Sequence, residues 1–308
     1  MSNPEPAFDA DYLAPRHDIP EGGRSGFLRV EGRQVHYLEW GHRGLPPVVA
    51  LHGGGQTAYM YEELGAAIGG RYHLVAPDLP GHGDSDPLPP AETFGREAFA
   101  AAIAPVLDAF GLDRVAIVGA SLGGITAITY AAGRPERVAA IVLIDVAHRL
   151  EAKGVQRIMD LMTAHESFAS LDEAAAEIRR YLPHRRNVRP QSLSRNLRQR
   201  ADGRWVWKHR MGQRWREQEA VTAEAPVGAE AILAGLDEDA AGLRCPVLVL
   251  RGAASDVLSG QSAQEIVDLI PQARLAVVER AGHLAAGDNP QSTNALISEF
   301  LDEVIPAP

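Results

Sequence analysis

Residues 117–124, Ile-Val-Gly-Ala-Ser-Leu-Gly-Gly, place one serine between glycines at the end of an apolar run. This stretch has three readings. Ser121 is a nucleophile on a tight turn, or the glycines cradle a phosphate, or small residues let a helix pack close to a sheet. A phosphate loop needs G-x-x-x-x-G-K-[ST] or G-x-G-x-x-G, and neither is present. The packing interpretation stays open on these residues alone, because a five-residue pattern occurs by chance.

The nucleophile interpretation has a physical basis. Residues 119–123 fit G-x-S-x-G, in which a tight strand-to-helix turn holds the serine in an unfavourable backbone conformation. A Cβ at Gly119 or Gly123 would clash with neighbouring backbone. The serine Oγ would project at the carboxyl end of the sheet, where the N-terminus of the next helix favours a developing oxyanion. We therefore predict that Ser121 is a nucleophile.

Around this stretch the chain alternates between short apolar runs and helical segments. We predict an α/β fold with a mostly parallel central sheet and helices on both faces, because nearly all-apolar strands are buried on both sides. An antiparallel hairpin around Glu31 and Gly32 precedes it. The expected strands are 46–53, 72–78, 114–121, 138–145, 245–252 and 274–279, and the expected helices lie near 57–69, 93–110, 122–133, 261–270 and 290–304.

The strand rhythm stops between about residues 147 and 240, and this segment is polar and helical in character. An insertion of distinct composition between two strands of a sheet is typical of a lid. We therefore predict an irregular arm (1–25), a core in two pieces (26–146 and 241–308) and a helical cap (147–240).

A serine hydroxyl needs a base to take its proton, and the base needs a third group to orient it. His283 follows the last strand in a glycine-containing loop, so it is expected at the same sheet edge as Ser121. Asp256, a few residues after the strand at 246–251, is our choice for the acid, because its loop leaves room to approach a histidine. Asp145, at the end of the strand at 138–145, is the rival, and its alternative role is to cap the next segment.

Stabilisation of an oxyanion requires two backbone donors. One is expected from the N–H of Leu122, directly after the nucleophile. The other is expected from the glycines of Leu-His-Gly-Gly-Gly-Gln-Thr (51–57), with Gly54 preferred and Gly55 next. The alternative for these glycines is a flexible loop without a role in chemistry.

Five segments together resemble the α/β-hydrolase superfamily: "LHGGGQT", "DLPGHGDSD", "VGASLGG", "LRGAASDVLS" and "AGHLAAGDNP". The resemblance covers residues 26–146 and 241–305 and implies a Ser-Asp-His triad at Ser121, Asp256 and His283. It also implies an acyl-enzyme mechanism with no metal and no organic cofactor. His82 and Asp84 fall in a turn that is structural in this family. Epoxide hydrolases and haloalkane dehalogenases of similar layout carry aspartate where Ser121 stands, which argues against both.

The predicted cap is rich in arginine and tryptophan. From Arg179 to Arg216 it holds twelve arginines and Lys208 against one acidic residue, Asp202. One hypothesis is a pocket roof, in which Trp205, Trp207 and Trp215 bind substrate and an arginine pairs with a substrate carboxylate. The other is that the tryptophans anchor the lid while the arginines reach solvent. Trp205 and Trp207 would share one face if the stretch is extended.

Composition limits the partners. The chain has 308 residues, a net charge of −10 and one cysteine, Cys245, so no intramolecular disulfide can form. The negative charge argues against nucleic acid and anionic membranes. No secretory signal and no apolar run long enough for a membrane span is seen, so we predict a cytoplasmic protein. Opposite charges on cap and core are compatible with a homodimer.

These features predict a serine hydrolase that cleaves a carboxylic ester of a small molecule. The alternatives within enzymes are a carbon–carbon bond hydrolase of the meta-cleavage type, a lactonase and a cofactor-free perhydrolase, because all share the triad. An alternative of another class is a ligand-binding protein on a hydrolase scaffold.

Overall fold

A computed structural model describes residues 19–88, 95–182, 185, 188–209 and 232–305. Its centre is an eight-stranded sheet with the order β1-β2-β4-β3-β5-β6-β9-β10. β1 and β2 are antiparallel to their neighbours, and the other strands are parallel. The mostly parallel sheet predicted from the apolar runs is confirmed. The strands are β1 (Arg24–Val30), β2 (Arg33–Trp40), β3 (Pro47–Leu51), β4 (His73–Pro77), β5 (Val115–Ala120), β6 (Val138–Ile144), β9 (Val247–Gly252) and β10 (Ala273–Val278).

The predicted hairpin is confirmed as β1 and β2. Its two turn residues both have positive φ, 50° at Glu31 and 79° at Gly32, and Val30 pairs with Arg33 across the turn. Two successive positive-φ residues form the hairpin turn whose twist matches that of the strands.

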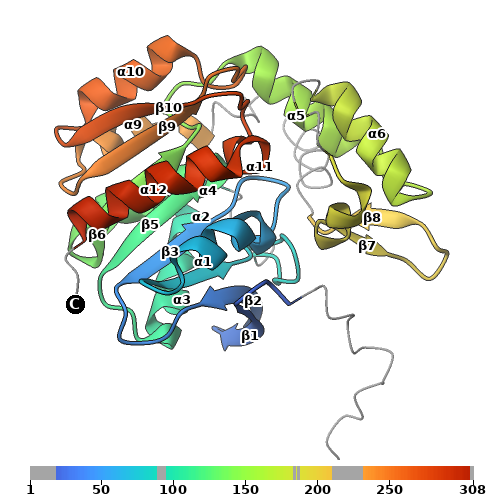
Figure 1. Cartoon of the computed structure of the whole chain (residues 1–308), viewed down its shortest axis with the longest axis horizontal. Helices are drawn as coiled ribbons and strands as arrows, with labels where there is room; N and C mark the ends of the chain where they lie inside the picture. The colour runs from blue at the N-terminus through green and yellow to red at the C-terminus, as the bar shows by residue number, and fades with distance from the viewer. Residues whose placement is uncertain (1–18, 89–94, 183–184, 186–187, 210–231, 306–308) are drawn as a thin grey trace, which may run out of the picture.

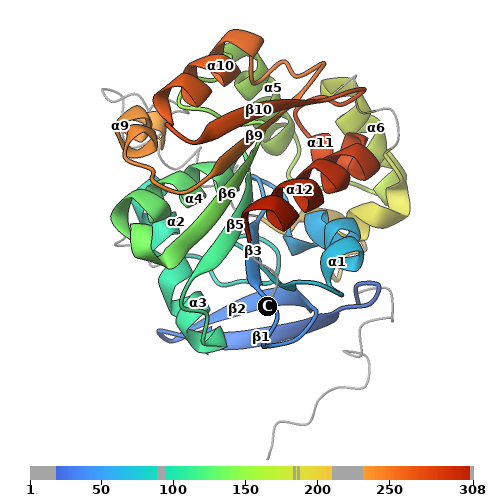
Figure 2. The same cartoon turned by 60° about the vertical axis from the view of Figure 1, so that its left-hand side comes forward.

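Helices cover both faces of the sheet, as Figure 2 shows. Because the side chains of a strand alternate between the two faces, the buried apolar residues of each strand divide between two layers. Val115 and Ile117 of β5 face one layer, while Ala116 and Val118 face the other. The first layer is covered by α2 (Arg96–Ala101), α3 (Ile103–Phe110), α4 (Leu122–Gly133), α9 (Leu236–Ala241) and α10 (Gly260–Leu269), and the second by α1 (Glu62–Ile68), α11 (Ala285–Asp288) and α12 (Pro290–Val304).

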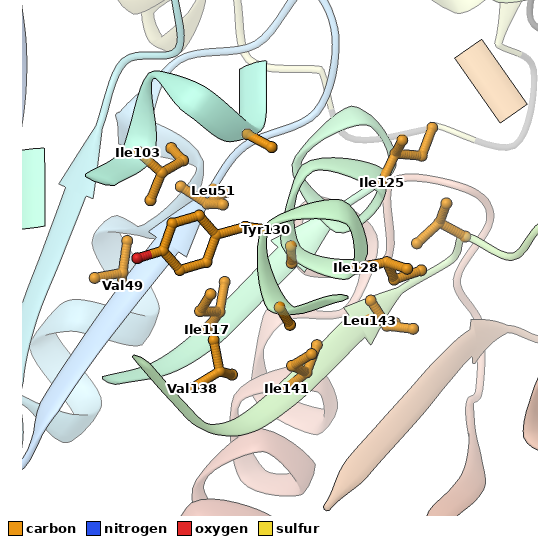
Figure 3. Packing of buried hydrophobic residues seen from close by; sticks show 14 of the residues in the cluster. Val49, Leu51, Ile103, Ile117, Ile125, Ile128, Tyr130, Val138, Ile141 and Leu143 are labelled. Atoms are coloured by element: carbon orange, nitrogen blue, oxygen red, sulfur yellow. The ribbon is translucent and has the colours of Figure 1, made fainter. Parts of the chain in front are cut away.

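The helix α4 packs in the middle of the first layer. Ile128 and Tyr130 are fully buried and lie against the sheet among side chains such as Ile117 and Ile141 (Figure 3). Burial of the Ile128 side chain contributes about 1.5–3 kcal/mol. This packing fixes the axis of α4 relative to β5, and thus the turn between them.

A second group of elements follows β6 and lies beside the carboxyl end of the sheet (Figure 1). It contains α5 (Ala152–Ala164), α6 (Leu171–Tyr181), the 3-10 helix η5 (Pro190–Arg195) and a hairpin of two three-residue strands, β7 (Leu197–Gln199) and β8 (Trp205–Trp207). We call residues 147–209 the cap segment. It has strands as well as the expected helices, while α9, within the predicted cap range, packs on α4 and α10 of the core.

The helix α6 shows why this polar sequence forms a helix. The Ser170 hydroxyl accepts a hydrogen bond from the N–H of Glu173 at 3.1 Å, which caps the first turn. Acidic residues occupy the first turn and arginines the last, matching the helix dipole. Its apolar side buries Ala174, Ala175 and Ile178 in a small core of the cap segment.

Among the described residues, no helix is both long and apolar enough to cross a membrane.

Candidate active site

Ser121 occupies the turn between β5 and α4. Its φ is 47° and its ψ is −116°, a region that non-glycine residues rarely adopt. Its N–H donates to the Ile144 carbonyl at 3.1 Å, and its own carbonyl accepts from Gly124 and Ile125. The turn therefore holds the residue in a strained conformation by hydrogen bonds on both sides, a pattern common at functional sites.

The two flanking glycines are required by space. A Cβ at Gly119 would lie 2.5 Å from the Gly123 carbonyl oxygen, and one at Gly123 would lie 2.0 Å from the Leu51 carbonyl oxygen. Both clashes are with backbone, which confirms the steric expectation. The absence of a side chain at Gly123 lets the start of α4 pack closely against the end of β3.

His283 lies in the loop after β10, and its side chain is 7% exposed. Its Nδ1 donates to Oδ2 of Asp145 at 2.8 Å. The other ring nitrogen, Nε2, then carries the lone pair. His283 and Ser121 line one cavity.

The prediction that Asp256 orients His283 is wrong. The partner of His283 is Asp145, the rival candidate. Asp145 follows β6, is fully buried, and has a φ of 51°. Its Oδ1 accepts from the Gly252 N–H at 2.8 Å, and its Oδ2 accepts from the Ser255 hydroxyl at 2.6 Å. These donors fix the carboxylate in place and aim it at the histidine.

Asp256 points elsewhere because Ser255, one residue earlier, occupies the position beside Asp145. The Ser255 hydroxyl also accepts from the N–H groups of Val257 and Leu258, which fixes the turn. The Asp256 carboxylate forms an ion pair with Arg157 of α5. Asp256 still lines the cavity, as a wall residue.

The signal that favours Asp145 lies in the strand order. β5 and β6 are adjacent parallel strands, with Ala120 paired to Ile144, so Ser121 and Asp145 leave the sheet side by side. β9 lies one strand further away. Sequence alone places both acids at the same edge but does not give this order.

The glycine loop after β3 lies beside Ser121. A Cβ on Gly53 would lie 3.4 Å from the Cβ of Ser121. Gly54 and Gly55 line the cavity, and Gly55 has a φ of 74°. His52 fixes the start of the loop, since its Nδ1 donates to the Gly53 carbonyl at 2.8 Å.

The cavity has a volume of about 180 Å³ and lies between the sheet edge and the cap segment. Its walls are mainly aliphatic side chains and methionines from α5 and α6. Two ionisable groups that the sequence did not single out, Arg185 and Asp288, also line it. The lining includes Leu150, Val155, Ile158, Met159, Leu161, Met162, Ile178 and Leu182.

The three tryptophans predicted to bind substrate differ in their position relative to the cavity. Trp207 lines the cavity and stacks on His209, with ring centroids 5.4 Å apart. Trp205 shares its face, and both pack on the small core of the cap segment, but Trp205 is not among the described lining residues. Trp215 lies outside the described residues.

Several cations of the cap segment anchor it to the core. Arg195 pairs with Glu62, and its Nη2 lies 2.9 Å from the carboxylate. Lys208 pairs with Asp84 at 2.9 Å. The Arg198 guanidinium donates to the Gly83 carbonyl at 2.9 Å. Basic residues therefore anchor the cap segment to the core, whereas the second hypothesis gave that role to the tryptophans and had the arginines reach solvent.

Three histidines meet where the cap segment touches the core. His52 and His82 lie 5.1 Å apart and His82 and His209 lie 6.1 Å apart, measured between ring centroids. Burial lowers the pKa of His52 and holds the pKa of His82 well below its usual value. Burial, with the nearby His52 adding to the effect, lowers the pKa of His209 to about 4. All three are therefore neutral at pH 7.

One further cluster has ligand atoms close enough to hold a cation. His36, Asp78 and Asp84 lie within 4.8 Å of one another by these atoms. Asp78 already accepts from the His36 Nδ1 at 2.7 Å, from the Ala58 N–H at 2.7 Å and from the Asp84 N–H at 3.0 Å. These donors satisfy the carboxylate, so the group ties the turn after β4 to its surroundings.

Comparison with known proteins extends these observations. The family model described as "alpha/beta hydrolase fold" matches residues 46–290. An esterase of Mycobacterium tuberculosis is 29% identical over 283 residues, which cover 89% of this chain and 88% of the esterase. The 2-hydroxy-6-oxo-6-phenylhexa-2,4-dienoate hydrolase of Comamonas testosteroni is 26% identical over 300 residues. This alignment covers 92% of this chain and 98% of that enzyme.

Among solved structures, an alpha/beta hydrolase from Novosphingobium aromaticivorans superposes with a TM-score of 0.75 at 27% identity. The match covers 92% of this chain and 99% of that one.

Proposed function

Because the chain belongs to the alpha/beta hydrolase fold family, we propose that it is a serine hydrolase that cleaves a carboxylic ester of a small molecule through an acyl-enzyme. The observation that carries this proposal is the hydrogen bond from His283 to the buried Asp145, at the edge of the cavity that Ser121 enters. The likeness to an esterase over most of both chains supports the same reaction class.

In the first half-reaction, Oγ of Ser121 attacks the ester carbonyl carbon while Nε2 of His283 takes its proton. Asp145 keeps the lone pair on Nε2 and stabilises the imidazolium that forms. When the tetrahedral intermediate collapses, the carbon–oxygen bond to the alcohol breaks, and Nε2 returns the proton to that oxygen. The acyl group stays on Ser121.

In the second half-reaction, Nε2 takes a proton from water, which attacks the acyl carbon. Collapse breaks the bond to Ser121, and the proton passes from His283 to the serine oxygen. The products are the free acid and the regenerated enzyme. The reaction needs no metal or organic cofactor in this scheme.

The negative charge of each intermediate would be held by the N–H groups of Leu122 and Gly54. Leu122 is the first residue of α4, where N–H groups have no partner within the helix. The contact of Gly123 with the end of β3 brings this helix start next to the loop that contains Gly54. Removal of one such donor typically costs 10²–10³ in turnover.

The test is Ser121→Ala with p-nitrophenyl esters of increasing chain length. We expect turnover to fall by several orders of magnitude with an unchanged unfolding temperature. An active-site titration with a slowly deacylating ester adds a burst of one equivalent of p-nitrophenol in the unmodified protein. Activity retained in Ser121→Ala would falsify the assignment, and absence of the burst would favour a ligand-binding protein.

A second candidate is hydrolysis of a carbon–carbon bond. It is favoured by the likeness to the Comamonas dienoate hydrolase over nearly the whole of both chains. Parallel assays of a meta-cleavage dienoate, a lactone and the p-nitrophenyl esters separate the candidates, because a strong preference for the dienoate would replace the esterase proposal.

A further inference from the structure

Arg185 differs from Arg157, Arg195 and Arg204 of the cap segment. It lies between α6 and η5 and lines the cavity. Arg157, Arg195 and Arg204 each have an acceptor, namely Asp256, Glu62 and Ser167. Within the described part of the chain, the Arg185 guanidinium makes no hydrogen bond and no ion pair. It is therefore not an anchor like its neighbours.

The position of Arg185 is set by α11, which begins just after His283. A Cβ on Gly287 would lie 3.3 Å from its Nη2, so the guanidinium packs where this glycine leaves room. Burial lowers the pKa of Arg185, while the nearby Asp288 opposes the shift. The guanidinium thus lies beside the loop of the catalytic histidine.

A cation beside apolar walls is unfavourable unless an anion or acceptors replace its lost hydration. Asp288 attracts Arg185 without a direct ion pair, and its Oδ2 already accepts from the Gly282 N–H at 2.9 Å. The five N–H donors of a guanidinium match a carboxylate in a two-pronged geometry. The remaining acceptor must come from what enters the cavity.

We propose that Arg185 forms a carboxylate-binding subsite, so that the substrate is an ester that also carries a free carboxylate. The aliphatic wall of α5 and α6 packs against the carbon chain between the two groups. With a cavity of about 180 Å³, this chain is short. The inference rests on the proposed esterase function for the reaction but not for the binding.

Binding is tested first, without turnover. Calorimetry with hexanoate and with 1-hexanol on the intact protein measures the contribution of the charge. We expect hexanoate to bind more tightly, and Arg185→Gln to weaken hexanoate about 10- to 100-fold, as expected for hydrogen bonds to a charged group. The affinity for 1-hexanol should stay within about 3-fold. Arg185→Lys keeps the positive charge but loses the two-pronged donor geometry of the guanidinium. It should therefore weaken hexanoate binding less than Arg185→Gln does.

The matched control is Arg204→Gln, because Arg204 belongs to the same segment but donates to Ser167. It should leave both affinities unchanged. If hexanoate and 1-hexanol bind alike, or if Arg185→Gln weakens both equally, the subsite does not exist.

Turnover then identifies the side of the ester that carries the carboxylate. One pair is mono-p-nitrophenyl glutarate against p-nitrophenyl valerate, and the other is 4-carboxyphenyl valerate against phenyl valerate. Arg185→Gln should lower kcat/KM for the charged member of one pair by about 10- to 100-fold. An effect in neither pair overturns the inference. If no ester is cleaved while hexanoate still binds through Arg185, the proposed function fails and the subsite stands.

Discussion

The proposed acid of the site depends on which of two aspartate side chains reaches His283. Asp145 and Asp256 both lie near the carboxyl edge of the sheet, and only Asp145 reaches His283. We expect Asp145→Asn to lower kcat about 10³- to 10⁴-fold, because an amide stabilises the wrong form of the histidine. Asp256→Asn should cost less than about 10-fold, as a wall residue does. Steady-state kinetics of both variants, with unfolding temperatures as the control, measures the difference.

The reverse order of effects would return the acid role to Asp256. The comparison also shows what sequence can predict at the scale of residues. Ser121 is predicted from its position directly after an apolar strand, and His283 from its place in the loop that follows the last strand. The choice between the two acids depended on strand order and on the Ser255 hydroxyl, and neither is a local property of the sequence.

At the scale of elements, the packing of α5 against the core depends on Gly154. A Cβ at Gly154 would lie 2.1 Å from the carbonyl oxygen of Asp256, which is backbone and cannot turn away. We expect Gly154→Ala to lower the free energy of unfolding by about 1–3 kcal/mol. The helix must shift, so KM should rise as well, since α5 lines the cavity. Urea unfolding and ester kinetics measure the two effects.

Gly133→Ala is the matched control, because Gly133 is also helical and a Cβ there meets nothing within 4 Å. It should be neutral or stabilising by up to about 1 kcal/mol. Equal destabilisation of both variants would show that helix glycines, and not this contact, matter.

The predictability of elements followed their length and pattern. The six parallel strands and the helices α4, α10 and α12 lie within two residues of the expected ranges, because continuous apolar runs mark the strands and each of these helices spans ten or more residues. The strands β7 and β8 have three residues each and were not expected, since so short a run carries no period. The helix α9 lies almost wholly within the predicted cap range 147–240 but packs on α4, and its acidic sequence does not indicate this contact.

At the scale of the whole molecule, the three neutral histidines join the cap segment to the core. The pKa of His209 is about 4 in the folded protein and near 6.5 when unfolded. The unfolded chain therefore binds the proton more tightly, and stability falls as the pH drops from about 6.5 towards 4. We expect the unfolding temperature to fall over this range, and the fall to be about 2–4 °C smaller in His209→Gln.

The exposed His42 provides the control, because it takes no part in the contact among His52, His82 and His209. His42→Gln should keep the acid sensitivity of the unmodified protein. An identical pH profile in His209→Gln would mean that other groups cause the acid loss.

Because Asp145, and not Asp256, pairs with His283, the proposed reacting groups and the cavity wall that selects the substrate come from different segments. The proposed acid and the proposed nucleophile directly follow two adjacent central strands, and Asp256 and Val257 of the loop after β9 line the cavity wall. Exchanging those two wall residues should therefore change which molecules are accepted without dismantling the reacting groups. The fold thus offers a place where selectivity can diversify while the chemistry is inherited intact.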